Sequence, residues 1–309
     1  MTHKVIGCIL LLNFIWLPGN AQEEKESAIQ KYKSEYLASE VKDGKEIKWR
    51  GNVNKCDEGN TSDKIKNKAL LRINYFRILS GLRPVKFKDE YNALAQKAAF
   101  ITHVNNKINH NPDPSSKCYS EESVIATSNS SLGFMDFVYY PELAFITEFV
   151  KDYGEFNKAV GHRRAMLYSR SVNKGYGTTL RAEAIYSDYT SWLEKDSTLF
   201  PKYFSYPVGG YNEIDLVFPR WSFSIPDIYK VDFKEAVVEL KDETGRLINV
   251  TVLPYEDIYD PTLVWELKDK LKRDYFLNHS VTVDIKNVRV NESLRSYSYQ
   301  VRFFDYVGD

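Results

Sequence analysis

The chain has 309 residues, enough for two domains and a leading segment. Hydrophobic residues make up 43% and charged residues 27%, which is typical of globular proteins and excludes a disordered or membrane-embedded chain. The formal net charge is +0, so the chain lacks the basic excess of proteins that bind nucleic acid or anionic membranes.

Residues 1–21 have the pattern of a signal peptide for export. Lys4 supplies a positive charge, residues 5–17 are mostly apolar, and Ala21 is a small residue suited to cleavage. The apolar run is shorter than the about 20 residues of a membrane-spanning helix. We therefore expect a protein that is secreted to the extracellular space or cell envelope, with no transmembrane anchor after the signal is removed. Lipidation of Cys8 is an alternative, although most of the apolar run follows that cysteine.

Residues 22–55 are charged and have no sustained apolar run, which predicts a solvated arm or loose helix. The ordered domain is expected to start near Cys56. Once Cys8 is removed, Cys56 and Cys118 form an even pair in an oxidising compartment. That setting favours a disulfide over two buried thiols, and a disulfide argues against a cysteine nucleophile.

Residues 56–200 predict an α+β domain. Ser62 is a candidate N-cap for a helix that ends at Gly81, and a second helix follows Asp89 and ends near Asn105. The helices come before the strands, which favours an α+β arrangement over alternating βαβ units. The other expected elements are a polar loop at residues 121–133, helices at 143–150 and 160–167, and strands at 175–177 and 182–189.

Residues 205–309 predict a small antiparallel β-sandwich. Apolar and polar residues alternate with a period of two, and residues 242–245 have the composition of a hairpin turn. Several short, half-buried strands of this kind are typical of a sandwich. The alternating runs cover residues 248–252, 263–267, 281–286 and 297–303.

Three histidines are the candidates for chemistry in the first domain. His103 falls inside the second helix, where a structural or exposed role is expected. His110 lies in the loop after that helix, and His162 opens the last helix. Imidazole titrates near neutral pH and is the commonest metal ligand. A nearby carboxylate could orient an imidazole, and Asp152 and Glu148 are placed to do so. The alternative is that each histidine makes a local hydrogen bond that fixes a turn.

An ordered series of short motifs runs through residues 56–200. In chain order they are Asn74-Tyr75-Phe76-Arg77, Gly81-Leu82, the alanine-rich run at 95–99, His110, Ser128-Asn129, residues 149–152, Gly161-His162-Arg163-Arg164 and Gly175-Tyr176-Gly177. The series resembles the CAP superfamily, also called SCP-like, which includes cysteine-rich secretory, antigen-five and pathogenesis-related proteins. It is most similar to bacterial members.

The resemblance implies an α-β-α sandwich with a central cleft that holds two histidines and two acidic residues. His110 and His162 match the histidines, and Asp152 matches one acidic position, with Asp in place of the usual Glu. Ser128-Asn129 stands where a Glu-Asn pair is usual, which removes one carboxylate. We also place Glu148 in the cleft. His110, His162 and Asp152 could supply three ligands to a divalent metal such as zinc.

Asn74 and Arg77 are given a structural role, in which both bond loop carbonyls and pin the cleft wall. Arg163 and Arg164 are expected to hold the third helix through Asp152 or Glu148. The segments around Trp221 and Trp265 also resemble those that follow bacterial CAP domains.

Three functions follow as expectations. The first is a binding protein with a lipid or other small ligand in the cleft and a β-sandwich for contact with an extracellular protein or surface. The second is a secreted hydrolase with His110 or His162 as general base, although the sequence has no G-x-S-x-G or H-E-x-x-H motif. The third is a structural envelope protein with a vestigial cleft. No nucleic-acid partner is expected.

Overall fold

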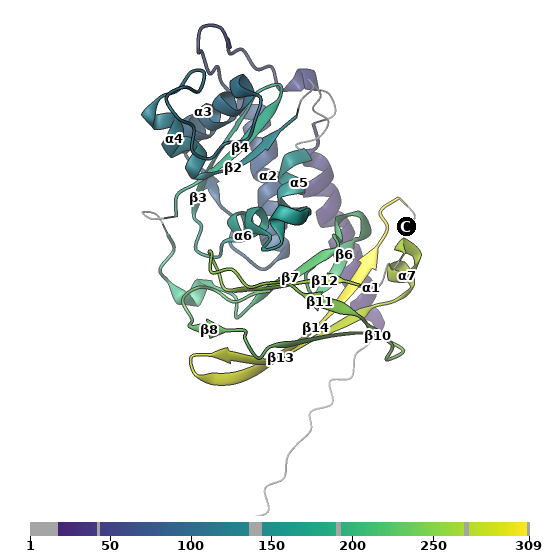
Figure 1. Cartoon of the computed structure of the whole chain (residues 1–309). Coiled ribbons are helices and arrows are strands. Elements are labelled where there is room, and N and C mark those ends of the chain that lie inside the picture. Colours follow the sequence, from purple (N-terminus) through teal and green to yellow (C-terminus); the bar gives the residue numbers. More distant parts are fainter. Residues whose placement is uncertain (1–17, 42–43, 136–143, 190–192, 269–271, 308–309) are drawn as a thin grey trace, which may run out of the picture.

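A computed structural model describes residues 18–41, 44–135, 144–189, 193–268 and 272–307. It combines helices with antiparallel and mixed sheets, so the chain is α+β. Figure 1 shows one part in which helices surround a small sheet and a second part built from two further sheets. Most of the predicted export signal, residues 1–17, lies outside the described residues. Among the residues described, no helix is long and apolar enough to cross a membrane.

The segment predicted as a solvated arm or loose helix is partly helical, and some of its residues are buried in the first core. Helix α1 (Pro18–Lys31) begins at a proline, which the first turn of a helix tolerates. It continues into a π-helical turn, Tyr32–Tyr36, and a 3₁₀ turn, Leu37–Ser39. The core takes in Tyr32, Val41 and Ile47 from this segment. The prediction that order begins near Cys56 is therefore wrong, because these scattered apolar side chains are buried by tertiary contact and not by any local periodicity.

Helices α2 (Asp63–Leu79) and α3 (Asp89–Asn105) form where the sequence predicts them. Ser62 caps α2 by accepting a hydrogen bond from the Ile65 N–H at 3.4 Å. Asn106 adopts the left-handed conformation that ends α3.

A four-stranded sheet lies between these helices in the order β1-β3-β4-β2. Its strands are β1 (Lys86–Phe87), β2 (Ser130–Phe134), β3 (Asn173–Thr178) and β4 (Ala182–Ser187). Ala182, Ala184 and Tyr186 pack with α3, while Ile185 and Tyr176 belong to the core around α2. Alternate side chains of β4 therefore point to opposite faces of the sheet, and helices pack on both faces.

Glycines in β3 let the sheet approach α3 closely. A Cβ at Gly175 would lie 2.0 Å from the Tyr91 carbonyl oxygen, and one at Gly177 would lie 2.2 Å from the Gln96 nitrogen. The Gly-Tyr-Gly sequence is thus required by backbone packing.

Residues 121–133 are not the predicted polar loop. They form α4 (Glu121–Ser128) and then β2, which pairs with β4. A capping box between Ser120 and Ser123 begins α4, so the polar residues that suggested a loop are the ones that start a helix. The remaining elements of this part are α5 (Ala144–Lys151), the 3₁₀ turn η4 (Glu155–Asn157) and α6 (Gly161–Leu167).

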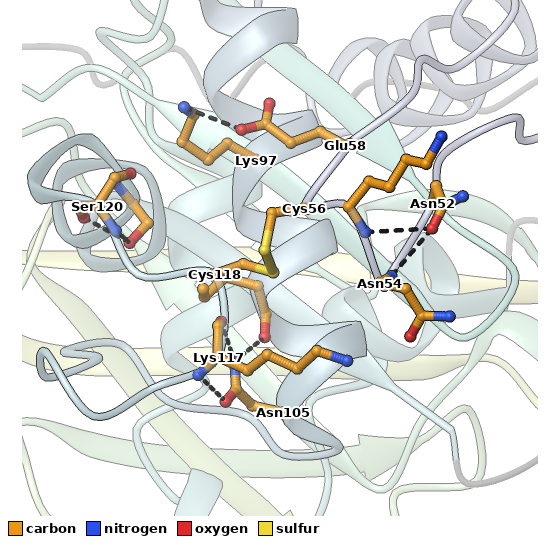
Figure 2. Close-up of a disulfide and its surroundings, with 12 residues drawn as sticks. Asn52, Asn54, Cys56, Glu58, Lys97, Asn105, Lys117, Cys118 and Ser120 are labelled. Carbon is orange, nitrogen blue, oxygen red and sulfur yellow. Dashed lines mark hydrogen bonds and ion pairs between the residues drawn. A yellow bond between two sulfur atoms is a disulfide. The ribbon is translucent and has the colours of Figure 1, made fainter.

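The predicted disulfide between Cys56 and Cys118 is present, with Cα atoms 5.4 Å apart. Figure 2 shows it joining the loop before α2 to the loop before α4. Asn105 exchanges two hydrogen bonds with the backbone of Lys117 beside the bridge. The disulfide thereby fastens both loops over the end of α3.

The second part contains two sheets that share a core. The six-stranded sheet has the order β10-β9-β13-β14-β6, with β8 beside β13, and comprises β6 (Gly210–Glu213), β8 (Val231–Asp232), β9 (Val237–Asp242), β10 (Leu247–Ile248), β13 (Val281–Val290) and β14 (Ser293–Phe304). The four-stranded sheet has the order β11-β12-β7-β5 and comprises β5 (Phe204–Tyr206), β7 (Arg220–Ser224), β11 (Val250–Val252) and β12 (Thr262–Leu267). Trp221 and Trp265 of one sheet are buried in the same core as Val283 and Val301 of the other. The second part also contains short helical elements, which are η5 (Ser197–Leu199), η6 (Ile214–Leu216) and α7 (Arg273–Asn278).

Two details differ from the predicted antiparallel sandwich. Strand β6 pairs in parallel with β14. The alternating run at 248–252 is not one strand, because β10 and β11 belong to different sheets and the chain crosses between them. Period-two alternation predicts a half-buried strand but carries no information about which sheet it joins.

The two parts are packed together. Phe204, Tyr206 and Phe304 from the second part are buried in the core of the first. The first core is therefore closed only with residues from beyond the predicted boundary near residue 200.

Candidate functional site

A pocket of about 270 Å³ lies among α4, α6 and a loop of the second part. His110, Ser128, Asn129 and His162 all line it, so the structure brings together four of the residues predicted for the cleft. His110 comes from the loop after α3, Ser128 and Asn129 from the end of α4, and His162 from the first turn of α6.

The His162 ring is oriented by Asp152. Its Nδ1 lies 2.8 Å from Asp152 Oδ1, and the backbone N–H of His162 donates to Oδ2 at 2.7 Å. The Asp152 side chain is only 1% exposed, whereas that of His162 is 30% exposed. Phe149 stacks on the imidazole with ring centroids 5.1 Å apart. A carboxylate only accepts, so the contact sets Nδ1 as the protonated nitrogen and leaves the Nε2 lone pair for the pocket.

The His110 ring is also oriented by a hydrogen bond at Nδ1, with a different partner. Its Nδ1 lies 2.9 Å from the Thr127 carbonyl oxygen, which can only accept. The Thr127 hydroxyl donates in return to the His110 carbonyl at 3.1 Å. Both pocket histidines therefore have Nδ1 bound to an acceptor, which leaves Nε2 as an acceptor in the neutral ring.

The predicted metal centre is not formed by the described residues. No three or more of their His, Cys, Asp and Glu side chains are grouped so that they could hold a metal ion. The reason is visible at Asp152, whose two oxygens already accept from His162 and from the Arg163 N–H. The expected three-ligand site of His110, His162 and Asp152 is thus corrected to two histidines, with Asp152 behind one of them.

Glu148 is also displaced from its predicted place. It is exposed on α5, pairs with Lys151 at 3.3 Å, and is not among the described residues that line the pocket. Glu148 and Asp152 were expected on one face of the same helix, one turn apart. They are not, because α5 ends at Lys151 and Asp152 takes a left-handed φ of 46°.

Asn74 and Arg77 hold the loops near the pocket from α2. The Asn74 amide exchanges hydrogen bonds of 3.0 and 2.8 Å with the backbone of Val85. Arg77, fully buried, donates to the carbonyls of Met166 and Tyr168, which end α6. The two side chains contact backbone and not the pocket.

The side chains of Arg163 and Arg164 have other partners than the predicted carboxylates, although the Arg163 backbone N–H donates to Asp152 at 3.2 Å. Arg163 donates from its side chain to the carbonyls of Val150 and Lys151 at the end of α5, and to the Ser222 hydroxyl of the second part. Burial lowers the pKa of Arg163 to about 10, which still leaves it charged at neutral pH. Arg164 reaches across to the second part, as described below.

Sequence reasoning missed the residues that the second part contributes. Glu256, Ile258 and Tyr259 line the pocket from the loop between β11 and β12. Phe156 also lines it, from η4, and is 100% exposed. Phe156 is fully exposed, so it is not part of any periodic apolar pattern that would single it out in the sequence. The loop of Glu256 lies about 100 positions after His162, and no local pattern links the two.

His103 lies apart from this pocket, on α3. Its ring is 5.2 Å from that of Trp49, and burial, with a smaller effect from Arg181, lowers its pKa. This agrees with a structural role and not with one in the cleft.

Comparison of the chain with models of known protein families gives no match. Comparison with the curated proteins gives no significant match either.

Proposed function

We propose that this chain is an exported, CAP-type binding protein that holds a small ligand in the pocket between His110 and His162. The observation that carries the proposal is that two imidazoles from distant segments line one pocket, each with Nδ1 fixed and Nε2 available. Side chains held in this way are pre-organised to accept hydrogen bonds from a ligand.

The family assignment is part of the proposal. The ordered motifs of the sequence support it, as do helices on both faces of a four-stranded sheet, the arrangement expected of an α-β-α sandwich. The disulfide between Cys56 and Cys118 supports export, because such bonds persist in oxidising compartments. The second part would then mediate contact with an extracellular protein or surface.

The test is an inventory of compounds retained by the exported protein, made by mass spectrometry after native purification. We expect a retained small molecule that is lost when His110→Ala and His162→Ala are combined. His279→Ala is the matched control, because that ring pairs with Glu243 outside the pocket. Retention that survives the double substitution, or an empty wild-type protein, would contradict the proposal and favour a vestigial cleft.

A hydrolase is the second candidate, and the pairing of Asp152 with His162 favours it. An acceptor that holds Nδ1–H leaves Nε2 as a base, as in catalytic triads. No Ser, Thr or Cys side chain of the described residues hydrogen-bonds to the His162 ring, so the base would act on water. Incubation with ester and peptide libraries tests this: turnover that His162→Gln abolishes in a folded protein supports hydrolysis, and absence of turnover contradicts it.

A further inference from the structure

The far wall of the histidine pocket belongs to the second part of the chain. Glu256, Ile258 and Tyr259 lie in the loop that joins β11 to β12 and line the same pocket as His110 and His162. The pocket is therefore formed by both parts of the chain. Glu256 is the only acidic residue among the described residues that line it.

The wall is fixed to the helix that carries His162. Arg164, two positions along α6, donates to the carbonyls of Glu256 at 3.1 Å, of Ile258, and of Asp260 at 3.0 Å. Asp260 in turn accepts from the Ser169 N–H at 2.7 Å and from its hydroxyl at 2.8 Å. Arg164 and Asp260 are buried, with exposed fractions of 4% and 2%. The loop is thus tied to α6 by Arg164 and to the residues just after α6 by the bonds between Ser169 and Asp260.

The imidazole and carboxylate groups of the residues that line this pocket are hydrogen-bond acceptors. A neutral imidazole with Nδ1 bound to an acceptor has its lone pair on Nε2, and Glu256 is the one acidic residue among the described residues that line the pocket. Imidazole nitrogens and a carboxylate both accept from the N–H donors of an ammonium group, and no Lys or Arg is among the described residues that line the pocket. A metal ion is the less suitable cation, because the described residues contain no group of three ligands for one.

The size of the pocket limits the ligand. At about 270 Å³ it lies below the about 300–1,000 Å³ of pockets that bury a drug-sized molecule. Ile258, Ala159 and the exposed Phe156 add apolar surface to its lining. A short alkyl chain that ends in an amine has the matching charge, donors and length.

We propose that the pocket binds small primary amines as their ammonium ions, with Glu256 as the residue that selects for positive charge. This inference rests on the proposed binding function and adds the ligand class and the specificity residue. Arg164 is a positioning residue, since it acts on the ligand only through the loop that it holds.

The probe is n-butylamine, titrated at constant pH into the full chain while the imidazole signals are followed by NMR. We expect saturable shifts at His110 and His162, with His103 and His279 as internal references. n-Butanol has the same chain without the charge and should bind at least fivefold more weakly. Glu256→Gln should raise the Kd for butylamine at least fivefold, whereas Glu235→Gln, an exposed carboxylate of the second part outside the pocket, should leave it unchanged.

Arg164→Lys should raise the Kd in a folded protein, because one ammonium group cannot reach carbonyls on three loop residues. Three results would overturn the inference: no shift with butylamine, equal affinity for butanol, or an unchanged Kd in Glu256→Gln. Shifts caused by zinc alone would do the same. If the natively purified protein retains a neutral or anionic compound that the double histidine variant loses, the binding function stands and the amine assignment falls.

Discussion

Asp152 holds His162 at two points, accepting from the ring Nδ1 at 2.8 Å and from the backbone N–H at 2.7 Å. The contact both starts α6 and orients the imidazole, so the helix and the site depend on the same buried carboxylate. This makes Asp152 the residue at which stability and function are most closely coupled.

We expect Asp152→Asn to lower the free energy of unfolding by about 1.5–3 kcal/mol, the usual contribution of hydrogen bonds to a charged group. Asn tolerates the left-handed backbone at this position, with φ of 46°, so the loss reports the carboxylate and not the backbone. Urea denaturation measures it. The control is Glu148→Gln, an exposed carboxylate on α5 that should change stability by less than about 0.5 kcal/mol. Equal stability of Asp152→Asn and wild type would contradict the prediction.

The disulfide should contribute about 4 kcal/mol, since it joins residues 62 positions apart and loop closure is costly at that length. The double variant Cys56→Ser, Cys118→Ser is expected to unfold at correspondingly lower denaturant concentration. Reductant should shift the wild type to the same midpoint and leave the double variant unaffected. If reductant does not move the wild-type midpoint, the bridge does not stabilise the fold.

Gly175→Ala should destabilise the packing of β3 on α3 by more than about 3 kcal/mol or prevent folding, because the new Cβ would meet the Tyr91 carbonyl oxygen at 2.0 Å. Gly209→Ala is the matched control, since a Cβ there meets nothing closer than 3.5 Å. Thermal denaturation and the yield of folded protein provide the measurement. Similar behaviour of the two variants would contradict the close approach.

Glu183 predicts a pH dependence of stability. It is fully buried, Tyr176 donates to it at 3.0 Å, and burial raises its pKa from 4.5 to about 8. Because the folded state holds the proton more tightly, the stability from this group is fully present below about pH 4.5 and is lost as pH rises through about 8. Each unit of pKa difference corresponds to about 1.4 kcal/mol.

Glu183→Gln cannot titrate, so the stability of this variant relative to wild type should increase as pH rises from 5 to 8.5. Urea denaturation at several pH values measures the difference, in which all other titrating groups cancel. Glu235→Gln, exposed in the second part, should show no such trend. A difference for Glu183→Gln that stays constant with pH would be the contrary result.

Local sequence signals predicted the elements that local interactions stabilise. Helix α2 has a capping serine and apolar residues at helical spacing, and residues 281–286 of β13 alternate between buried and partly buried. Helix α4 was missed because it is short and polar, and its start depends on two serines that also suit a loop. The burial of Tyr32, Val41 and Ile47 was missed because these residues are isolated in the sequence.

The site was predictable only in part. A family resemblance placed His110 and His162 in one cleft, and both line one pocket. The wall around Glu256 was beyond sequence reasoning, because its position depends on hydrogen bonds that Arg164 donates to carbonyls 92 to 96 positions away. Those bonds use backbone atoms of the loop, which every sequence possesses.

The rings of Tyr32 and Phe304 meet edge to face in the first core, with centroids 6.1 Å apart. Tyr32 lies directly after α1 and Phe304 ends β14, so a ribosome makes one long before the other and this core stays open on one side until β14 has been made. Apolar side chains such as Tyr75 and Phe76 are then available to chaperones until the last strand arrives. A stop codon before Phe304 would consequently damage a core to which residues made much earlier contribute.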